Sequence, residues 1–270
     1  MSGLRHGTVI IAVGDEVLGG FTADSNSHWL ATRVREAGFP AERIEVVADR
    51  HEAIVAAIRR AVDDPRADRV VVSGGLGPTP DDITLEAVAA ALGLRLDVHP
   101  AALAHVQGIV DRMSAAGWIA EPAISDANRK MTLAPAGAGI LENRRGMASG
   151  IVVTLDGDRL LFVLPGVPRE LQAIVAEEMI PRHFQGATAP AVTELRYTDV
   201  IEAEIAGPMR AVAVAFPDVT VGSYPQTDRR ELIVRVSGAD RERVAAAAAA
   251  VDALRLAQGA GGETPAPALS

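Results

Sequence analysis

The stretch formed by residues 69–86 constrains the fold more than any other part of the chain. It opens with the apolar run 70–72, continues through a loop rich in Gly and Pro, and ends in the adjacent carboxylates Asp81 and Asp82. Short β-branched runs bounded by Gly and Pro are typical of interior strands in an α/β sheet. Ligands of such sheets bind in the crevice beyond the carboxyl ends of the strands. The sequence therefore predicts a ligand site at this loop.

The residues of the loop favour a phosphate ligand that is bound together with a cation. Glycines can adopt a positive φ and bring backbone amides close to a ligand, and such amides hold phosphate oxygens. Asp81 and Asp82 would repel a bare phosphate, so they indicate a divalent cation, Mg²⁺ or a similar ion. A simpler interpretation is that the glycines only make a turn and that Asp82 caps the next helix. We favour the ligand site and expect phosphate contacts from Ser73, Gly74, Gly75, Gly77 and Thr79.

Polar residues also follow the first two predicted strands, residues 8–13 and 43–47. They are Gly14, Asp15, Glu16, Asp24, Asn26 and Asp49. Because the carboxyl ends of parallel strands share one edge of a sheet, we expect these residues to meet Asp81 and Asp82 there. The acids would then form a cage of oxygen ligands for the cation, with Glu16 among them. The alternative is that the last three residues of the series only cap their helices.

The order of the predicted elements indicates an α/β domain with a mostly parallel sheet. Besides the three strands already named, we expect helices at 27–37, 52–63 and 83–92, and a loop at 17–20. This alternation implies right-handed crossovers and helices on both faces of the sheet. Later elements are expected to be helices at 100–115, 125–131 and 169–179 and a hairpin of strands 150–155 and 159–164. We expect the domain to occupy residues 1–180.

The remainder of the chain predicts a second, smaller module. Residues 181–190 are polar and interrupted by proline, which is typical of a linker. Residues 191–257 have the pattern of a βαββα unit, an α+β module. Residues 258–270 are rich in Gly, Ala and Pro, a composition that favours a disordered tail.

Composition excludes several classes of function. A net charge of −9 argues against nucleic acid or an anionic membrane surface as the main partner. The chain has no Cys, which excludes disulfides, thiolate metal sites and a Cys nucleophile. No apolar run approaches the roughly 18 residues of a membrane span. We therefore expect a cytoplasmic protein that binds a small molecule.

Several motifs resemble one known family. The sequence S-G-G-L-G-P-T-P-D-D-I-T at 73–84 resembles the signature of the MoaB/Mog molybdopterin-binding domain, in the form found in the CinA family (competence/damage-inducible protein A). Further similar stretches are G-D-E-V-L-G-G, N-R-K-M, L-P-G-V-P-R-E-L and G-S-Y-P, and the likeness covers residues 8–256. Gly19 departs from the family, which usually has a polar residue there. The resemblance implies a three-layer MoaB/Mog-like domain, a KH-like small module and a homo-oligomer, with a dimer as our expectation.

The resemblance also implies an activity and its residues. CinA-type domains are associated with metal-dependent cleavage of the pyrophosphate of ADP-ribose or a related nucleotide. In the Mog-type enzymes two aspartates are tied to catalysis, and by motif they correspond to Asp82 and Asp49. The metal ligands, argued from the charges of the loops and not from the resemblance, would be Asp81, Asp82 and Glu16. Nucleotide contacts outside the glycine loop would come from Gly14, Asn26, Asn128, Pro165 and Gly166.

Two other functions remain open from the sequence. One is adenylyl transfer to molybdopterin, as in the synthesis of the molybdenum cofactor, which would use the same phosphate site with a pterin pocket added. The other is a nucleotide- or pterin-binding module without catalysis. Many CinA proteins carry a further amidase domain that deamidates nicotinamide mononucleotide. This sequence has no residues that correspond to that domain, so we do not expect that activity.

Overall fold

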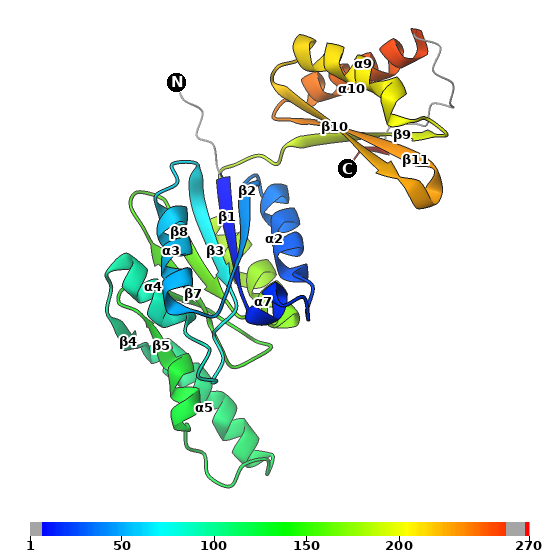
Figure 1. Ribbon diagram of the computed structural model, residues 1–270. Coiled ribbons are helices and arrows are strands. Elements are labelled where there is room, and N and C mark those ends of the chain that lie inside the picture. Colours follow the sequence, from blue (N-terminus) through cyan, green and yellow to red (C-terminus); the bar gives the residue numbers. More distant parts are fainter. Residues whose placement is uncertain (1–6, 258–267, 270) are drawn as a thin grey trace. The chain divides into compact units, whose positions relative to one another are not determined.

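The computed structural model describes residues 7–257 and 268–269, and the chain divides into two compact units after Ala187. The first unit is built on a six-stranded sheet with the order β2-β1-β3-β8-β7-β6 (Figure 1). Its parallel strands are β1 (Gly7–Val13), β2 (Ala41–Val47), β3 (Ala67–Ser73) and β8 (Leu160–Leu164). One edge is extended by β7 (Gly150–Thr154), which is antiparallel to β8, and by β6 (Gly139–Leu141), which is antiparallel to β7. The prediction of an α/β fold with a mostly parallel sheet is confirmed.

Helices cover both faces of this sheet, which confirms the three layers (Figure 1). Strand residues alternate between the faces, so neighbours in sequence enter different cores. Val70 and Val72 of β3 join the core under α3 (His51–Val62) and α4 (Thr84–Leu92). Val71 joins the core under α2 (Ser25–Glu36) and α7 (Pro168–Ile174). A strand buried on both faces must be apolar at every position, which is why this run has no polar alternation.

Several elements differ from the sequence prediction. The first two residues of the expected loop at 17–20 belong to a one-turn helix, α1 (Asp15–Leu18). The short strands β4 (Leu96–Val98), β5 (Leu133–Pro135) and β6 were not predicted. The helices α5 (Pro100–Ala115) and α6 (Asp126–Arg129) fall where helices were expected, and the 3-10 turn η1 (Lys130–Thr132) follows α6.

The prediction of a linker at 181–190 is wrong for its first residues, which are helical. After α7 the chain continues through the π-helical turn η2 (Val175–Met179) into α8 (Ile180–His183). Phe184 is buried at 6% exposure and packs edge-on against Phe39, with ring centroids 4.9 Å apart. The first unit therefore extends beyond residue 180, because an aromatic side chain of this segment belongs to its core.

The second unit has its own hydrophobic core. Its elements follow the expected βαββα order: β9 (Ala191–Thr198), α9 (Glu202–Ala215), β10 (Val219–Gln226), β11 (Glu231–Gly238) and α10 (Arg241–Ala257), with the 3-10 turn η3 (Thr227–Arg229) before β11. The sheet order is β10-β11-β9-β12. Tyr197 of β9, Val234 of β11 and Val251 of α10 are fully buried in this core.

The expected disordered tail, 258–270, lies outside the described residues except for β12 (Ala268–Leu269), which pairs with β9. None of the helices in the described ranges has the length and apolar character that a membrane crossing requires.

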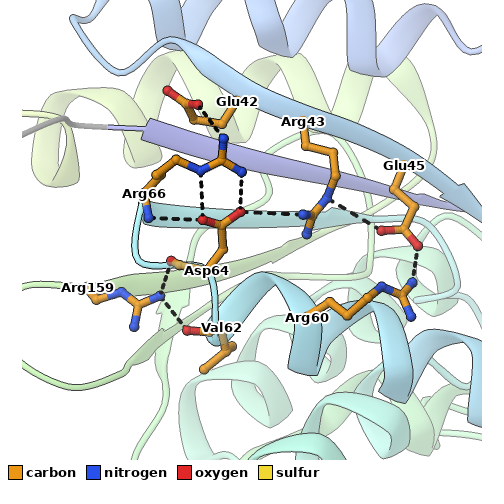
Figure 2. Close-up of polar contacts among 8 residues, drawn as sticks. All are labelled: Glu42, Arg43, Glu45, Arg60, Val62, Asp64, Arg66 and Arg159. Atoms are coloured by element: carbon orange, nitrogen blue, oxygen red, sulfur yellow. Dashed lines mark hydrogen bonds and ion pairs between the residues drawn. The ribbon is translucent and has the colours of Figure 1, made fainter.

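A charged network joins the amino-terminal ends of the strands, at the opposite edge of the sheet from the predicted site (Figure 2). Buried Asp64 accepts hydrogen bonds from Nε and Nη2 of Arg66 at 3.1 and 3.0 Å, and it pairs with Arg43 at 3.5 Å. Arg159 donates to the carbonyls of Val62 and Asp64 at 2.6 and 3.2 Å. The bonds from Arg66 lower the pKa of Asp64 from its ordinary value of 3.8 to about 2.

We expect Asp64→Asn to lower the free energy of unfolding by about 1–2 kcal/mol at pH 7, since the substitution removes a charged acceptor of several hydrogen bonds. A depressed pKa stabilises the fold above the ordinary value and ceases to do so as the pH falls through the folded value. The difference from the parent chain should therefore be constant above pH 3.8 and shrink toward about pH 2. Urea unfolding at several pH values measures it, with exposed Asp63→Asn as the control. An equal loss at pH 7 and at the acid end would contradict the assignment.

Candidate functional site

The carboxyl ends of β1, β3 and β8 open onto a cavity of about 760 Å³. The chain passes from β1 to β2 on one side and later returns to β3 on the other, so the strand order reverses beside β1. Ligands in open α/β sheets bind at such a reversal, because the loops leaving the two strands part there. The volume is in the range of pockets that hold a nucleotide-sized ligand. The topology therefore places this cavity where a ligand site is expected.

The loop after β3 is fixed by a close approach of backbone to backbone. Gly74 and Gly75 have φ values of +106° and +66°, which only glycine adopts readily. A Cβ on Gly74 would lie 2.2 Å from the carbonyl oxygen of Val13 in the neighbouring strand. The amide of Gly74 donates to the carbonyl of Leu164 at 3.0 Å. The loop is thus held between β1 and β8.

Three consecutive amides of this loop are free to bind an anion. Gly75, Leu76 and Gly77 line the cavity. Their N–H groups donate to no acceptor within the described residues. Consecutive unpaired amides in a turn that includes a left-handed residue form a concave site for anions. We call Gly75, Leu76 and Gly77 the amide cradle.

Asp82 and Thr79 are bonded to each other in the loop directly after the cradle. Oδ2 of Asp82 accepts hydrogen bonds from the amide of Thr79 at 2.8 Å and from its hydroxyl. The capping interpretation is therefore wrong, because Ile83 is the N-cap of α4 and Asp82 bonds backward into the loop. Thr79 does not line the cavity, and its hydroxyl serves Asp82 in place of the expected phosphate contact.

Lys130 closes the same loop from a distant part of the chain. Its Nζ donates to the carbonyls of Thr79 and Asp82 at 2.9 and 2.6 Å.

The Thr79 hydroxyl, the Asp81 amide and the Lys130 charge keep the pKa of Asp81 below its ordinary value. Asp81 is therefore a carboxylate at neutral pH, exposed at the mouth of the cavity.

Negative charge gathers on the other side of the cavity. Oδ2 of Asp49 accepts a hydrogen bond from the amide of Asp15 at 2.7 Å, so Asp49 joins the loop after β1 and does not cap α3, whose N-cap is Arg50. Burial raises the pKa of Asp49, and the backbone bond from Asp15 opposes this. The charges of Asp15, Glu16 and Asp81 raise it further. A cation placed among these groups would relieve their mutual repulsion.

These oxygens suit a divalent cation only in part. Asp81, Asp82 and Glu16 all line the cavity, and carboxylates are the ligands that Mg²⁺ prefers. Within the described residues, however, no three His, Cys, Asp or Glu side chains are grouped closely enough to hold a metal ion. The expected cage is therefore not preassembled. Mg²⁺ usually takes one or two carboxylates and completes its coordination with phosphate oxygens and water, so the donors fit an ion that arrives with a diphosphate.

The loop after β8 and the start of α2 complete the wall. Asp24 caps α2 by accepting from the amide of Ser27 at 2.9 Å, as the simpler interpretation held. Asn26 is not a cap, because its Nδ2 donates to the carbonyl of Gly166 at 2.7 Å. Its Oδ1 is buried without a partner in the described chain. That oxygen is an acceptor available to a ligand.

Almost all residues predicted for the site line this cavity. They are Gly14, Glu16, Asn26, Asp49, Ser73, Gly74, Gly75, Gly77, Asp81, Asp82, Asn128, Pro165 and Gly166. Asp24, also expected at this edge, lines the cavity as well, whereas Thr79 and Asp15 do not. Sequence reasoning missed Glu170, which lies inside the L-P-G-V-P-R-E-L motif, and three methionines, Met113, Met131 and Met147. Two motifs were usable signals, one for Glu170 and one for Met131, which ends N-R-K-M, whereas Met113 lies in α5 outside these motifs.

Comparisons with known proteins agree with this architecture. Residues 9–184 match the family described as probable molybdopterin binding domain, and residues 190–258 match the middle domain of FAD synthase. A protein from Pyrococcus abyssi is 35% identical over 233 residues, which span 86% of this chain and 90% of that protein. A CinA-like protein from Citrifermentans bemidjiense is 31% identical over 249 residues, which span 88% of this chain but 58% of that protein.

A solved structure is similar in fold and in sequence. The crystal structure of CinA from Thermoplasma acidophilum, a protein described as having unknown function, superposes with a TM-score of 0.58 at 31% identity. The match covers 66% of this chain and 99% of that one. The resemblance drawn from the motifs is confirmed. The chain belongs to the molybdopterin-binding domain family and, within it, to the CinA-like proteins.

Proposed function

We propose that the first unit binds a nucleotide diphosphate and hydrolyses its pyrophosphate bond, with ADP-ribose as the expected substrate. The observation that supports the proposal is the amide cradle, whose three residues have unpaired N–H groups and line the same cavity as several carboxylates. The amides of the cradle could bind an anion, and the carboxylates of the cavity could bind a cation. A diphosphate that carries a divalent ion satisfies both sets.

The residues of the cavity have distinct parts in the proposed reaction. The cradle amides would hold the oxygens of one phosphate and fix its orientation. Asp49, whose pKa is raised by burial, is suited to accept the proton of the attacking water. The water oxygen bonds to phosphorus, the bridging P–O bond breaks, and the leaving phosphate keeps the bridging oxygen. Asp82 would orient that water through Oδ1, which bonds to no described protein group.

A divalent ion is part of the proposal. Asp81, Asp82 and Glu16 would contribute ligands to it, and the ion would offset negative charge on the phosphate oxygens. Because these acids are not grouped as a complete site, the ion should bind weakly to the free protein. We expect its affinity to rise at least about tenfold when a non-hydrolysable diphosphate is bound, since phosphate oxygens complete the coordination.

A second candidate is adenylyl transfer to molybdopterin, or pterin binding without catalysis. It is supported by the family match over residues 9–184 and by the apolar side of the cavity, where Met113, Met131 and Met147 can pack on a flat heterocycle. Methionines adapt to either a purine or a pterin. The homodimer and the cytoplasmic location expected from the sequence remain predictions, and light scattering and cell fractionation test them.

One experiment separates these functions. The purified chain is incubated with ADP-ribose, other nucleoside diphosphate sugars and dinucleotides, in Mg²⁺, in Mn²⁺ and in EDTA, and released mononucleotide is measured. We expect AMP and ribose phosphate from ADP-ribose with a divalent ion and none in EDTA. A parallel reaction contains ATP and molybdopterin. An adenylated pterin, or tight binding without any product, would replace the hydrolase proposal with one of the alternatives.

A further inference from the structure

A second cavity of about 470 Å³ lies beside the first and has no part in the proposed hydrolysis. Its wall combines α5, through His105 and Arg112, with the loop 142–147. Met147 lines both cavities, so they are neighbours separated by this loop. We call the second cavity the arginine pocket, defined by Arg112, Arg144, Arg145 and His105.

The charge of the arginine pocket is opposite to that of the chain as a whole. Three arginines face one acid, Glu142, in a protein whose net charge is −9. Arg144 is engaged, because it donates to Glu142 at 3.1 and 3.2 Å and lies 3.8 Å from Glu177. The guanidinium groups of Arg112 and Arg145 form no hydrogen bond or ion pair with any described residue. Two permanently charged forks are thus available to a ligand.

The loop that carries these arginines is held in one conformation. Asn143 is fully buried, and its Nδ2 donates to the carbonyl of Ala148 at 2.8 Å and to Glu170 at 2.7 Å. Its Oδ1 accepts from the amide of Arg145 at 2.9 Å, which fixes the backbone from which that side chain projects. Nε2 of His105 lies 3.0 Å from the carbonyl of Gly146.

The same contacts connect the pocket to the main cavity. Glu170, the partner of Asn143, lines the main cavity, and a Cβ on Gly146 would lie 2.0 Å from its carboxylate. The loop is therefore packed against the wall of the proposed active site with no room for a side chain at that point. Met147 lines both cavities, so a ligand that fills the main cavity lies next to the residues of the arginine pocket.

We infer that the arginine pocket is a phosphate-binding subsite. Planar guanidinium groups bind phosphate through paired hydrogen bonds, and a cavity with a net positive charge in an acidic protein favours such an anion. Its phosphate is a monoester on the same nucleotide whose diphosphate lies in the amide cradle, an assignment that rests on the proposed function. The preferred substrate class is then a nucleotide diphosphate with one further phosphate, such as ADP-ribose phosphorylated on the 2′-hydroxyl of its adenosine.

Binding measurements test this without depending on catalysis. Isothermal titration in Ca²⁺, or in EDTA if Ca²⁺ supports turnover, compares ADP-ribose, its 2′-phosphorylated form and inorganic phosphate. We expect the phosphorylated form to bind at least about tenfold more tightly than ADP-ribose. Arg112→Gln and Arg145→Gln should each reduce that preference by roughly tenfold, so that a tenfold preference in the parent chain disappears. Arg95→Gln, a matched exposed arginine on the approach to β4, should leave the preference unchanged.

The outcomes identify the source of the phosphate. If inorganic phosphate binds together with ADP-ribose and loses affinity in Arg112→Gln and Arg145→Gln, the pocket holds a separate phosphate and the subsite stands. If both nucleotides bind equally and inorganic phosphate does not bind, the inference is overturned. Thermal unfolding of each variant checks the fold. Absence of turnover with either nucleotide would refute the proposed hydrolase while leaving these affinities to decide on the subsite.

Discussion

Asp82→Asn should lower the turnover of ADP-ribose by at least about 100-fold and leave the fold intact, the range expected when a group that positions or activates water is lost. The reason lies in how the two carboxylate oxygens are used. Oδ2 accepts both hydrogen bonds from Thr79, and an asparagine carbonyl can accept the same two bonds. Oδ1 bonds to no described protein group, so the substitution changes the charge at the cavity and little else.

Steady-state kinetics and urea unfolding of the same preparations measure this effect. Asp97→Asn is the matched control, because Asp97 is an exposed aspartate of β4 that does not line the cavity. It should retain the activity of the parent chain. We expect the loss in Asp82→Asn to fall on kcat more than on KM, since the residue acts on the water and the amide cradle holds the phosphate. Full activity in a folded Asp82→Asn protein would refute its assignment.

Thr79→Ala separates the structural role of the Thr79–Asp82 hydrogen bonds from the proposed catalytic role of the Asp82 carboxylate. Removing the hydroxyl takes one of the two hydrogen bonds from Oδ2 of Asp82 but leaves its charge. The backbone bond from Thr79 and the bonds from Lys130 remain, so a smaller loss than in Asp82→Asn is consistent with the assigned roles. A loss as large as that of Asp82→Asn would show that loop geometry, and not the carboxylate, limits turnover.

The parallel strands of the sheet could be predicted because their signal is local. Val70–Val72 and the run before Gly14 are apolar at every position, which is the pattern of a strand covered on both faces. The strands β4, β5 and β6 have three residues each, so no periodicity can develop. Their existence depends on pairing with distant strands, as β4 pairs with β5, and such pairing is not encoded in the neighbouring residues.

The error at the predicted linker has a different cause. The prediction places the start of the linker at Pro181, but this residue stands in the first turn of α8, a position that helices tolerate for proline. The preceding π-helical turn, η2, lets the chain continue from α7 into α8. A proline therefore does not mark a helix end by itself, and α9 likewise continues through Pro208 in its interior.

The glycine loop was predictable from chemistry, whereas its supports were not. Glycines followed by carboxylates indicate an anion site whatever surrounds them. Lys130 holds the glycine loop through Thr79, which is 51 residues away in sequence. Glu170 holds a different loop, 142–147, through Asn143, and that contact is equally distant from any local pattern. The separate role of Thr79 depended on which acceptor its hydroxyl reaches, a choice between the cavity and Asp82 that the sequence does not reveal.

Gly74→Ala should cause the largest loss of stability among the substitutions considered. An alanine there must adopt a left-handed backbone, and its Cβ would lie 2.2 Å from the carbonyl oxygen of Val13. That oxygen belongs to β1, whose side chains are buried, so it cannot move without disturbing the pairing of β1 with β3. Any shift of Gly74 instead weakens its bond to Leu164 in β8.

Gly137→Ala separates the steric clash from the backbone strain. Gly137 also has a positive φ, +81°, but a Cβ there would meet nothing within 4 Å. The strain alone should cost about 1–2 kcal/mol at Gly137, whereas we expect Gly74→Ala to cost at least about 3 kcal/mol more. Urea unfolding measures both. Gly74→Ala should also weaken the binding of ADP-ribose, because a displaced Gly74 moves the adjoining amides of the cradle. Equal losses in the two variants would mean that β1 tolerates the added carbon and that the close approach to Val13 does not position the amide cradle.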